Sequence, residues 1–252
     1  MKLGFLHIPR TGGTYLESLL AELGPQQFVN FFGTPGNQLT NRVGLIEKIQ
    51  DQPNKVTQII NNPNWENCKL FSGHFSHSIG SILSDNSIKY FTILRNPIQR
   101  TTSFVKKVTS SSKFAQILLS GADKIGDDVF WSNFNDYIRS ENKIGLLPHE
   151  RHGFSNYMVK AIAGCNLNDD NLVIGTQELE KAKANLDQMH YVGLFENYEQ
   201  TVKDILKIFD LQNTGTFRET SISTVPDTTG QLLREINAYD IDLYNYFLSK
   251  NE

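Results

Sequence analysis

A glycine-containing segment close to the amino terminus has the residue types of an anion-binding loop. It reads HIPRTGGTY over residues 7–15 and follows a short apolar run. Glycines allow successive backbone N–H groups to turn inward, and the start of a following helix adds unpaired donors and a partial positive charge. An arginine would add a full charge, and two threonine hydroxyls could donate to phosphate-type oxygens. The candidate anion-binding residues are Arg10, Thr11, Gly12, Gly13 and Thr14.

This segment also has a structural interpretation, which is a tight Gly-Gly turn closed by a capping threonine. It is not a Walker A loop, because that pattern places a lysine directly after its second glycine and none stands there. The residues of the segment by themselves support both anion binding and a purely structural turn.

A second segment, YFTILRNPIQRTTS at residues 90–103, places an arginine at the end of an apolar run. If both runs are strands of one sheet, Arg95 would face the same crevice as the first loop. Ser103 stands eight residues further on, inside a helix expected after Pro97, so a group bound there must lie beside that helix. Taken alone, the segment favours the alternative of an ion-paired arginine and a helix-surface serine.

Short apolar runs that alternate with segments of helical spacing position these residues. The runs predict strands at Leu3–His7, Lys69–Ser72, Tyr90–Leu94, Leu172–Ile174 and Tyr191–Leu194. Helices are expected from a Thr14 cap to Leu23, from Pro97 to about Val108, with interruptions over 113–165, and over Tyr198–Phe209 and Leu232–Leu248. Residues 30–42 and 212–230 have loop composition. This alternation predicts an α/β fold, a mostly parallel sheet flanked by helices with ligands at the carboxyl ends of its strands.

The composition is that of a globular protein with a sizeable core. Of the 252 residues, 39% are apolar and 20% charged, which excludes disorder as the main state. The net charge of −3 gives no general attraction to nucleic acid or to an anionic membrane. The charge is uneven, because basic residues outnumber acidic ones over 1–126 and the reverse holds over 127–252. We expect one domain over residues 1–252, with a basic half that can hold an anion.

Cysteine usage and hydropathy point to a cytoplasmic protein without a membrane span. Cys68 and Cys165 lie far apart and have no metal-ligand spacing, so neither a structural zinc nor a disulfide framework is expected. No apolar run reaches the roughly 18 residues that a transmembrane helix needs. The first ten residues turn polar too soon for a signal peptide.

Together, the two segments resemble the sulfotransferases that use 3′-phosphoadenosine 5′-phosphosulfate (PAPS). The likeness is closer to their carbohydrate-type branch, which includes heparan sulfate 2-O-sulfotransferase-like proteins and many bacterial members. That family has HIPKTGGT for the 5′-phosphosulfate and LRDPxxRxxS for the 3′-phosphate, and this chain has HIPRTGGT at 7–14 and LRNPIQRTTS at 94–103. Three further segments resemble the family more weakly, namely SGHF at 72–75, VGLFENYEQTVKDI at 192–205 and REINAYDIDLYNYF at 234–247.

The resemblance implies a single sulfotransferase domain with a P-loop-like parallel sheet, acting as a PAPS-dependent enzyme that sulfates a hydroxyl, most simply on a carbohydrate. It implies cofactor contacts from the 10–15 segment, Tyr15 included, and from Arg95 and Ser103. No metal is needed, because fixed cations and amides stand where magnesium would. His74 of the Gly-His segment is the candidate base for the acceptor hydroxyl; the alternative is a structural histidine. His77 is a poorer candidate, expected at the surface.

Two departures from the family pattern bear on activity. Arg10 replaces the loop lysine, and Asn96 replaces the aspartate after the strand-end arginine. Arginine keeps its charge and can bind the phosphosulfate, but it does not readily lose a proton. A non-catalytic nucleotide-binding relative therefore remains an alternative, as does a P-loop nucleotide kinase.

A group of polar residues close together in the sequence could bind an anionic sugar as the acceptor. These residues are His149, Arg151, His152, Asn156 and Lys160. A solvated surface of a helix and a loop explains them as well.

Overall fold

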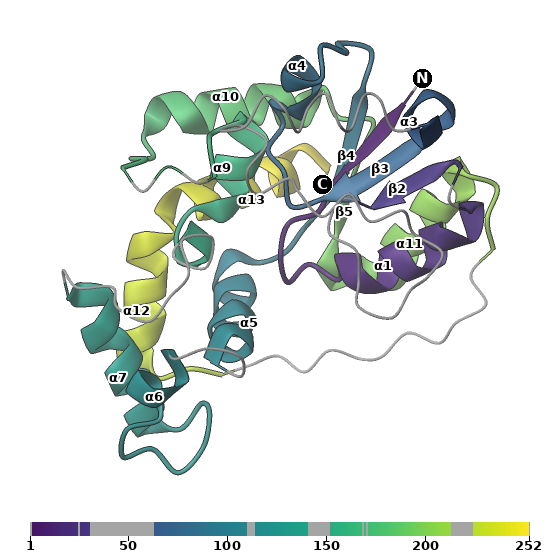
Figure 1. Ribbon diagram of the computed structural model, residues 1–252. Coiled ribbons are helices and arrows are strands. Elements are labelled where there is room, and N and C mark those ends of the chain that lie inside the picture. Colours follow the sequence, from purple (N-terminus) through teal and green to yellow (C-terminus); the bar gives the residue numbers. More distant parts are fainter. Residues whose placement is uncertain are drawn as a thin grey trace.

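The fold is built on a parallel sheet whose strands end at a common edge. The computed structural model (Figure 1) describes residues 2–24, 26–30, 63–109, 114–140, 152–167, 169, 171–212 and 224–251. Within these residues, a five-stranded sheet has the order β2-β3-β1-β4-β5. Its strands are β1 (Leu3–Leu6), β2 (Phe28–Asn30), β3 (Leu70–Gly73), β4 (Lys89–Leu94) and β5 (Tyr191–Leu194). Every pairing is parallel, which confirms the predicted α/β class.

Strand β1 occupies the centre of the sheet, and its register aligns the segments that follow each strand. Leu6 pairs with Gly73 of β3 and with Thr92 of β4. All four residues of β1 are buried, as expected for a central parallel strand covered on both faces. The loop after β1, His74 after β3 and Arg95 after β4 consequently lie at the same edge of the sheet.

Helices cover both faces of the sheet and form a separate group beyond its carboxyl edge (Figure 1). The α-helices are α1 (Gly13–Leu20), α3 (Pro63–Asn67), α4 (Ile79–Ile82), α5 (Pro97–Thr109), α6 (Phe114–Leu118), α7 (Asp128–Arg139), α9 (Tyr157–Ala163), α10 (Thr176–Asp187), α11 (Tyr198–Ile208), α12 (Asp227–Ile236) and α13 (Ala238–Asn251). Short 3-10 turns are η1 (Ala21–Leu23), η3 (His152–Phe154) and η4 (Phe195–Asn197). None of the helices in the described ranges is long and apolar enough to cross a membrane.

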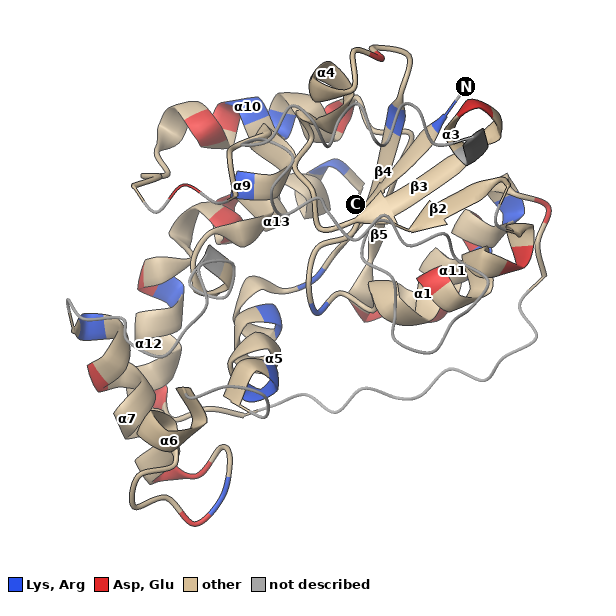
Figure 2. Cartoon of the chain, viewed as in Figure 1, with Lys and Arg blue, Asp and Glu red and all other residues tan. Residues whose placement is uncertain are grey.

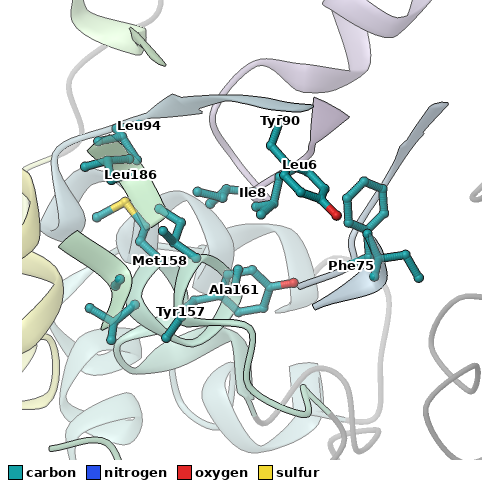
Figure 3. Packing of buried hydrophobic residues seen from close by; sticks show 14 of the residues in the cluster. Leu6, Ile8, Phe75, Tyr90, Leu94, Tyr157, Met158, Ala161 and Leu186 are labelled. Carbon is teal, nitrogen blue, oxygen red and sulfur yellow. The ribbon is translucent and has the colours of Figure 1, made fainter. Parts of the chain in front are cut away.

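Three apolar clusters hold these layers together. Helices α1 and α11 bury their apolar sides against one face of the sheet, and α9, α10 and α13 cover the other. In that second layer, Tyr157, Met158 and Ala161 of α9 lie against sheet residues such as Leu6 and Tyr90 (Figure 3). The third cluster joins α5, α6, α7 and α12 around Trp131 and several phenylalanines. This cluster anchors α5, which carries Ser103.

Most expected elements are confirmed within a residue or two, and three expectations are wrong. The run Leu172–Ile174 forms no strand, and Val173 in it is 83% exposed. The long helix expected over Leu232–Leu248 is divided at Asn237 into α12 and α13. Thr14 does not cap α1, because the N-cap is Gly12 and no side chain bonds there.

The two expected loops are only partly described. Asn30 ends the short edge strand β2, which composition did not indicate, and residues 31–42 lie outside the described ranges. In the expected loop over 212–230, α12 already begins at Asp227, and residues 213–223 are again outside what the structure describes.

Candidate functional site

The loop between β1 and α1 has an unusual backbone that its glycines permit. Arg10 and Gly12 have positive φ angles of 73° and 86°. A side chain at Gly12 would also overlap the ring of Tyr198, and one at Gly13 would overlap the ring of His7. The loop therefore requires glycine at both positions, and it presents the start of α1 at the edge of the sheet.

The hydroxyls of this loop have different surroundings. Thr11 is buried, and its Oγ1 donates a hydrogen bond of 2.8 Å to the Ile8 carbonyl. Thr14 lies exposed in the first turn of α1, and Tyr15 beside it is partly buried. In this arrangement Thr14 offers a hydroxyl to an anion at the helix start, whereas the Thr11 hydroxyl proton is already engaged.

The two segments singled out in the sequence meet directly. Arg10 Nε donates to Ser103 Oγ at 3.0 Å, and Arg95 Nη1 donates to the Arg10 carbonyl at 2.9 Å. In Figure 2 the segment linking β1 to α1 and the segment linking β4 to α5 both carry the Lys and Arg colour. Two guanidinium groups and a serine hydroxyl thus converge, which is a donor set suited to a phosphate.

Burial lowers the pKa of both of these arginines. Arg95 is only 8% exposed, and burial lowers its pKa to about 10, with Arg10 and Arg100 adding to the effect while Glu196 opposes it. Burial also lowers the pKa of Arg10. Arg95 Nε is buried without a hydrogen-bond partner in the described part of the chain. Both side chains remain charged at neutral pH, so an anion placed between them would relieve their mutual repulsion.

Asn96, which stands where the family pattern has aspartate, caps the start of α5. Its Oδ1 accepts hydrogen bonds from the N–H groups of Ile98 and Gln99, at 3.1 and 3.2 Å. Pro97 follows as the first helical residue, a position where proline loses no hydrogen bond. Asparagine and aspartate cap helices about equally well, so this departure from the family pattern leaves the start of α5 intact.

His74 lies beside the loop, in contact with a buried polar network. Its ring and that of His7 have centroids 4.5 Å apart and nearly perpendicular planes. His7 Nδ1 bonds to Glu17 Oε1 at 2.9 Å, and the Ser72 hydroxyl donates to the same oxygen. Burial acts to raise the pKa of Glu17, but His7, Ser72 and Asn30 outweigh it, and the pKa lies below its ordinary value. The candidate base therefore lies against a fixed carboxylate–imidazole pair.

Three contacts from the junction of β5 and α11 complete the site, and sequence reasoning missed all three. The Arg95 guanidinium lies over the ring of Phe195, 4.2 Å from its centroid. The Asn96 N–H donates to Glu196 Oε1 at 2.7 Å, and Tyr198 donates its hydroxyl to the Gly12 carbonyl at 2.6 Å. In the sequence, the only indication that this junction belongs to the site was the weak resemblance of residues 192–205 to a segment of the sulfotransferase family.

The suggested acceptor group does not form an exposed anion-binding surface where it is described. Lys160 is 5% exposed, and its Nζ donates to Ser155 Oγ at 3.3 Å. Asn156 Oδ1 accepts from the backbone N–H of Asp240. The remaining members of the group, His149, Arg151 and the side chain of His152, lie outside the described part of the chain.

His77 lies elsewhere and is not at the surface as expected. It is partly buried in a cavity near the start of β4, and its ring centroid is 4.4 Å from that of Tyr90. Burial, with a contribution from Lys181, lowers its pKa to about 4. At neutral pH His77 is therefore uncharged, and it is separated from the converging arginines by the length of the strand.

We expect His77 to make the protein less stable as the pH falls. In the unfolded chain His77 takes up a proton near pH 6.5, while in the folded protein it stays neutral down to about pH 4. The contribution of neutral His77 to the free energy of unfolding is therefore complete above pH 6.5 and is lost between pH 6.5 and pH 4. Denaturant unfolding at pH 7 and at pH 4.5 measures this loss. Between these two pH values, the free energy of unfolding of His77→Gln should fall by about 2–3 kcal/mol less than that of the wild type. His190→Gln, at an exposed histidine, is the matched control. Equal pH dependence in His77→Gln and wild type would contradict the assignment.

The chain is similar to a known protein family over nearly all of its length. Residues 1–247 match the sequence model of the Sulfotransferase family, which is nearly the full chain. No curated protein matches the chain. Among the residues that the structure describes, no three His, Cys, Asp or Glu side chains gather as a metal site would require.

Proposed function

The chain belongs to the sulfotransferase family, and on that premise we propose that it transfers the sulfuryl group of PAPS to a hydroxyl group of a carbohydrate. The observation that carries this proposal is the convergence of Arg10, Arg95 and Ser103 at the ends of β1 and β4. PAPS has a 5′-phosphosulfate and a 3′-phosphate, and the two segments supply one group of donors for each.

The residues present fit such a ligand. Arg95 and Ser103 would hold the 3′-phosphate, and the start of α1 with Arg10 and Thr14 would hold the 5′-phosphosulfate. Burying a cation costs free energy unless an anion compensates its charge. Arg95 is such a cation, and its buried Nε has no hydrogen-bond partner among the described residues. The positive φ at Gly12 and the close approach of Tyr198 shape the loop around this position.

Once bound, PAPS supplies an activated sulfuryl group and a nucleotide leaving group. The loop amides and Arg10 would hold the 5′-phosphate, and their fixed charge would stabilise the negative charge that develops there during transfer. Arg10 does this without giving up a proton, because arginine stays protonated. His74 would take the proton of the acceptor hydroxyl. Its ring contacts His7, and His7 is itself bonded to Glu17.

The carbohydrate acceptor rests on the resemblance of HIPRTGGT and LRNPIQRTTS to the carbohydrate-type branch. One observation favours a second candidate, a nucleotide-binding relative without turnover: Arg10 stands in place of lysine, and its Nε is bonded to Ser103. Membership in the sulfotransferase family speaks against the nucleotide-kinase alternative.

Calorimetry with nucleotides tests the proposal before any acceptor is known. We expect adenosine 3′,5′-bisphosphate to bind more tightly than 5′-AMP by about 1.5–3 kcal/mol, roughly tenfold or more, because its 3′-phosphate makes charge-assisted hydrogen bonds. Arg95→Ala should erase this margin, and Arg139→Ala on the exposed end of α7 should keep it. Tighter binding of ATP with Mg²⁺, or no binding at all, would remove the PAPS assignment.

A further inference from the structure

The turn that joins β5 to α11, residues 195–198, contacts both of the segments assigned to the nucleotide phosphates. Resting on the proposed function, we propose that this turn is a positioning element of the cofactor site, in which Phe195 orients Arg95 for the 3′-phosphate and Tyr198 holds the Gly12 loop for the 5′-group. The proposal assigns separate roles to two residues that neither the sequence motifs nor the family match singles out.

Phe195 fixes the plane of the Arg95 guanidinium. The guanidinium carbon lies over the face of the aromatic ring, 4.2 Å from the ring centroid. One edge of the same group is held by the bond from Nη1 to the Arg10 carbonyl. A planar fork of donors recognises phosphate only when its plane is correctly oriented, and the attraction between a cation and a ring face supplies that orientation. A leucine would fill the space but would lack the ring face.

Glu196 connects the turn to the helix that carries Ser103. Its Oε1 accepts the backbone N–H of Asn96 at 2.7 Å, and Asn96 in turn caps α5 through Ile98 and Gln99. This carboxylate also acts on Tyr244 of α13, whose pKa is raised by burial and by the charge of Glu196. The start of α5 and the Arg95 side chain are consequently held by adjacent residues of one turn.

Tyr198 acts on the other segment. Its hydroxyl donates to the Gly12 carbonyl at 2.6 Å, and its ring occupies the place that a Gly12 side chain would fill. Burial raises the pKa of this hydroxyl, so it remains a donor throughout the physiological range. With its carbonyl engaged, Gly12 keeps the left-handed conformation that starts α1, and the N–H groups at the start of this helix keep their direction.

The two roles predict different losses for two ligands. In calorimetry, Phe195→Leu should weaken adenosine 3′,5′-bisphosphate about threefold to tenfold and change 5′-AMP by less than about twofold. Phe195→Tyr keeps the ring face and should retain wild-type affinity for both ligands. Tyr198→Phe should weaken both ligands by the same factor, about threefold, since both carry the 5′-phosphate.

Thermal denaturation of each variant is measured first, and Phe195→Met replaces Phe195→Leu if that protein does not fold. Equal losses for the two ligands in Phe195→Leu, or an unchanged ratio of their affinities, would mean that Phe195 only supports the fold, and would overturn the inference. A wild-type protein without preference for the bisphosphate would instead refute the proposed function itself. The two failures are therefore distinguished by the wild-type measurement.

Discussion

Replacing His74 with alanine is expected to reduce sulfuryl transfer by about 10²–10⁴-fold, the usual contribution of a general base. The acceptor hydroxyl must lose its proton as the new bond forms, and His74 is the candidate base that lies at the loop edge of the sheet. Its ring contacts His7, which a buried carboxylate holds from the other side. The substitution removes no group from the arginine cluster, so affinity for adenosine 3′,5′-bisphosphate should stay within about twofold of wild type.

The measurement is transfer of radioactive sulfate from labelled PAPS to a panel of carbohydrate acceptors, with nucleotide affinity measured in parallel. His190→Ala removes an exposed histidine and is the matched control. Transfer by His74→Ala at the wild-type rate would exclude His74 as the base. A protein that binds the bisphosphate but sulfates no member of the panel, even as wild type, would favour the non-catalytic alternative.

A second large effect is expected on stability: Arg100→Ala should lower the free energy of unfolding by about 3–5 kcal/mol. Arg100 is completely buried, and its Nη2 donates to the Gly153 carbonyl at 2.7 Å and to Thr101 Oγ1 at 2.9 Å. Asp240, equally buried, is the opposing charge. Burial raises the pKa of Asp240 and the charge of Arg100 opposes that rise. Alanine would leave this carboxylate with its bonds from the Met158 and Val159 N–H groups but without the nearby positive charge.

Denaturant unfolding at pH 7 checks this expectation. The double variant Arg100→Met/Asp240→Asn removes both charges and should recover part of the loss, because neither charge is then left alone. Arg139→Ala, at the end of α7, controls for loss of an arginine at the surface. If Arg100→Ala costs less than about 1 kcal/mol, the buried pair does not hold α5 to the neighbouring helices.

The parts of the site with local causes could be predicted from the sequence. An apolar run, a glycine pair and helical spacing lie within residues 3–20, and they produce β1, the loop and α1. A proline after a strand likewise marks the start of α5 at Pro97. The order of strands and helices along the chain then implied a parallel sheet, whose carboxyl ends meet at one edge.

Other features depend on partners far away in the sequence. Asn237 interrupts the last helix because its amide is buried and bonded to the Phe154 carbonyl, to the Leu233 carbonyl and to the Asn156 N–H. The apolar spacing over 232–248 continues through this position and gives no sign of it. Similarly, the three residues of β2 are a strand because β3 pairs with them, whereas the more apolar run Leu172–Ile174 has no strand partner among the described residues.

The amino-acid sequence by itself determined the fold class and the order of the two candidate anion-binding segments, residues 7–15 and 90–103. These features follow from local sequence, because glycine turns, strand ends and helix starts depend on residues that are neighbours in the chain. Arg95, which the sequence had indicated, extends from the end of β4 and donates to the Arg10 carbonyl of the loop. Only the tertiary structure decided the place of the second arginine of LRNPIQRTTS, Arg100, which is fully buried and donates to the Gly153 carbonyl. The same is true of the turn at 195–198, whose contacts reach both segments. Side-chain direction and distant partners follow from how the helices and strands pack, and residue spacing along the chain does not encode that packing.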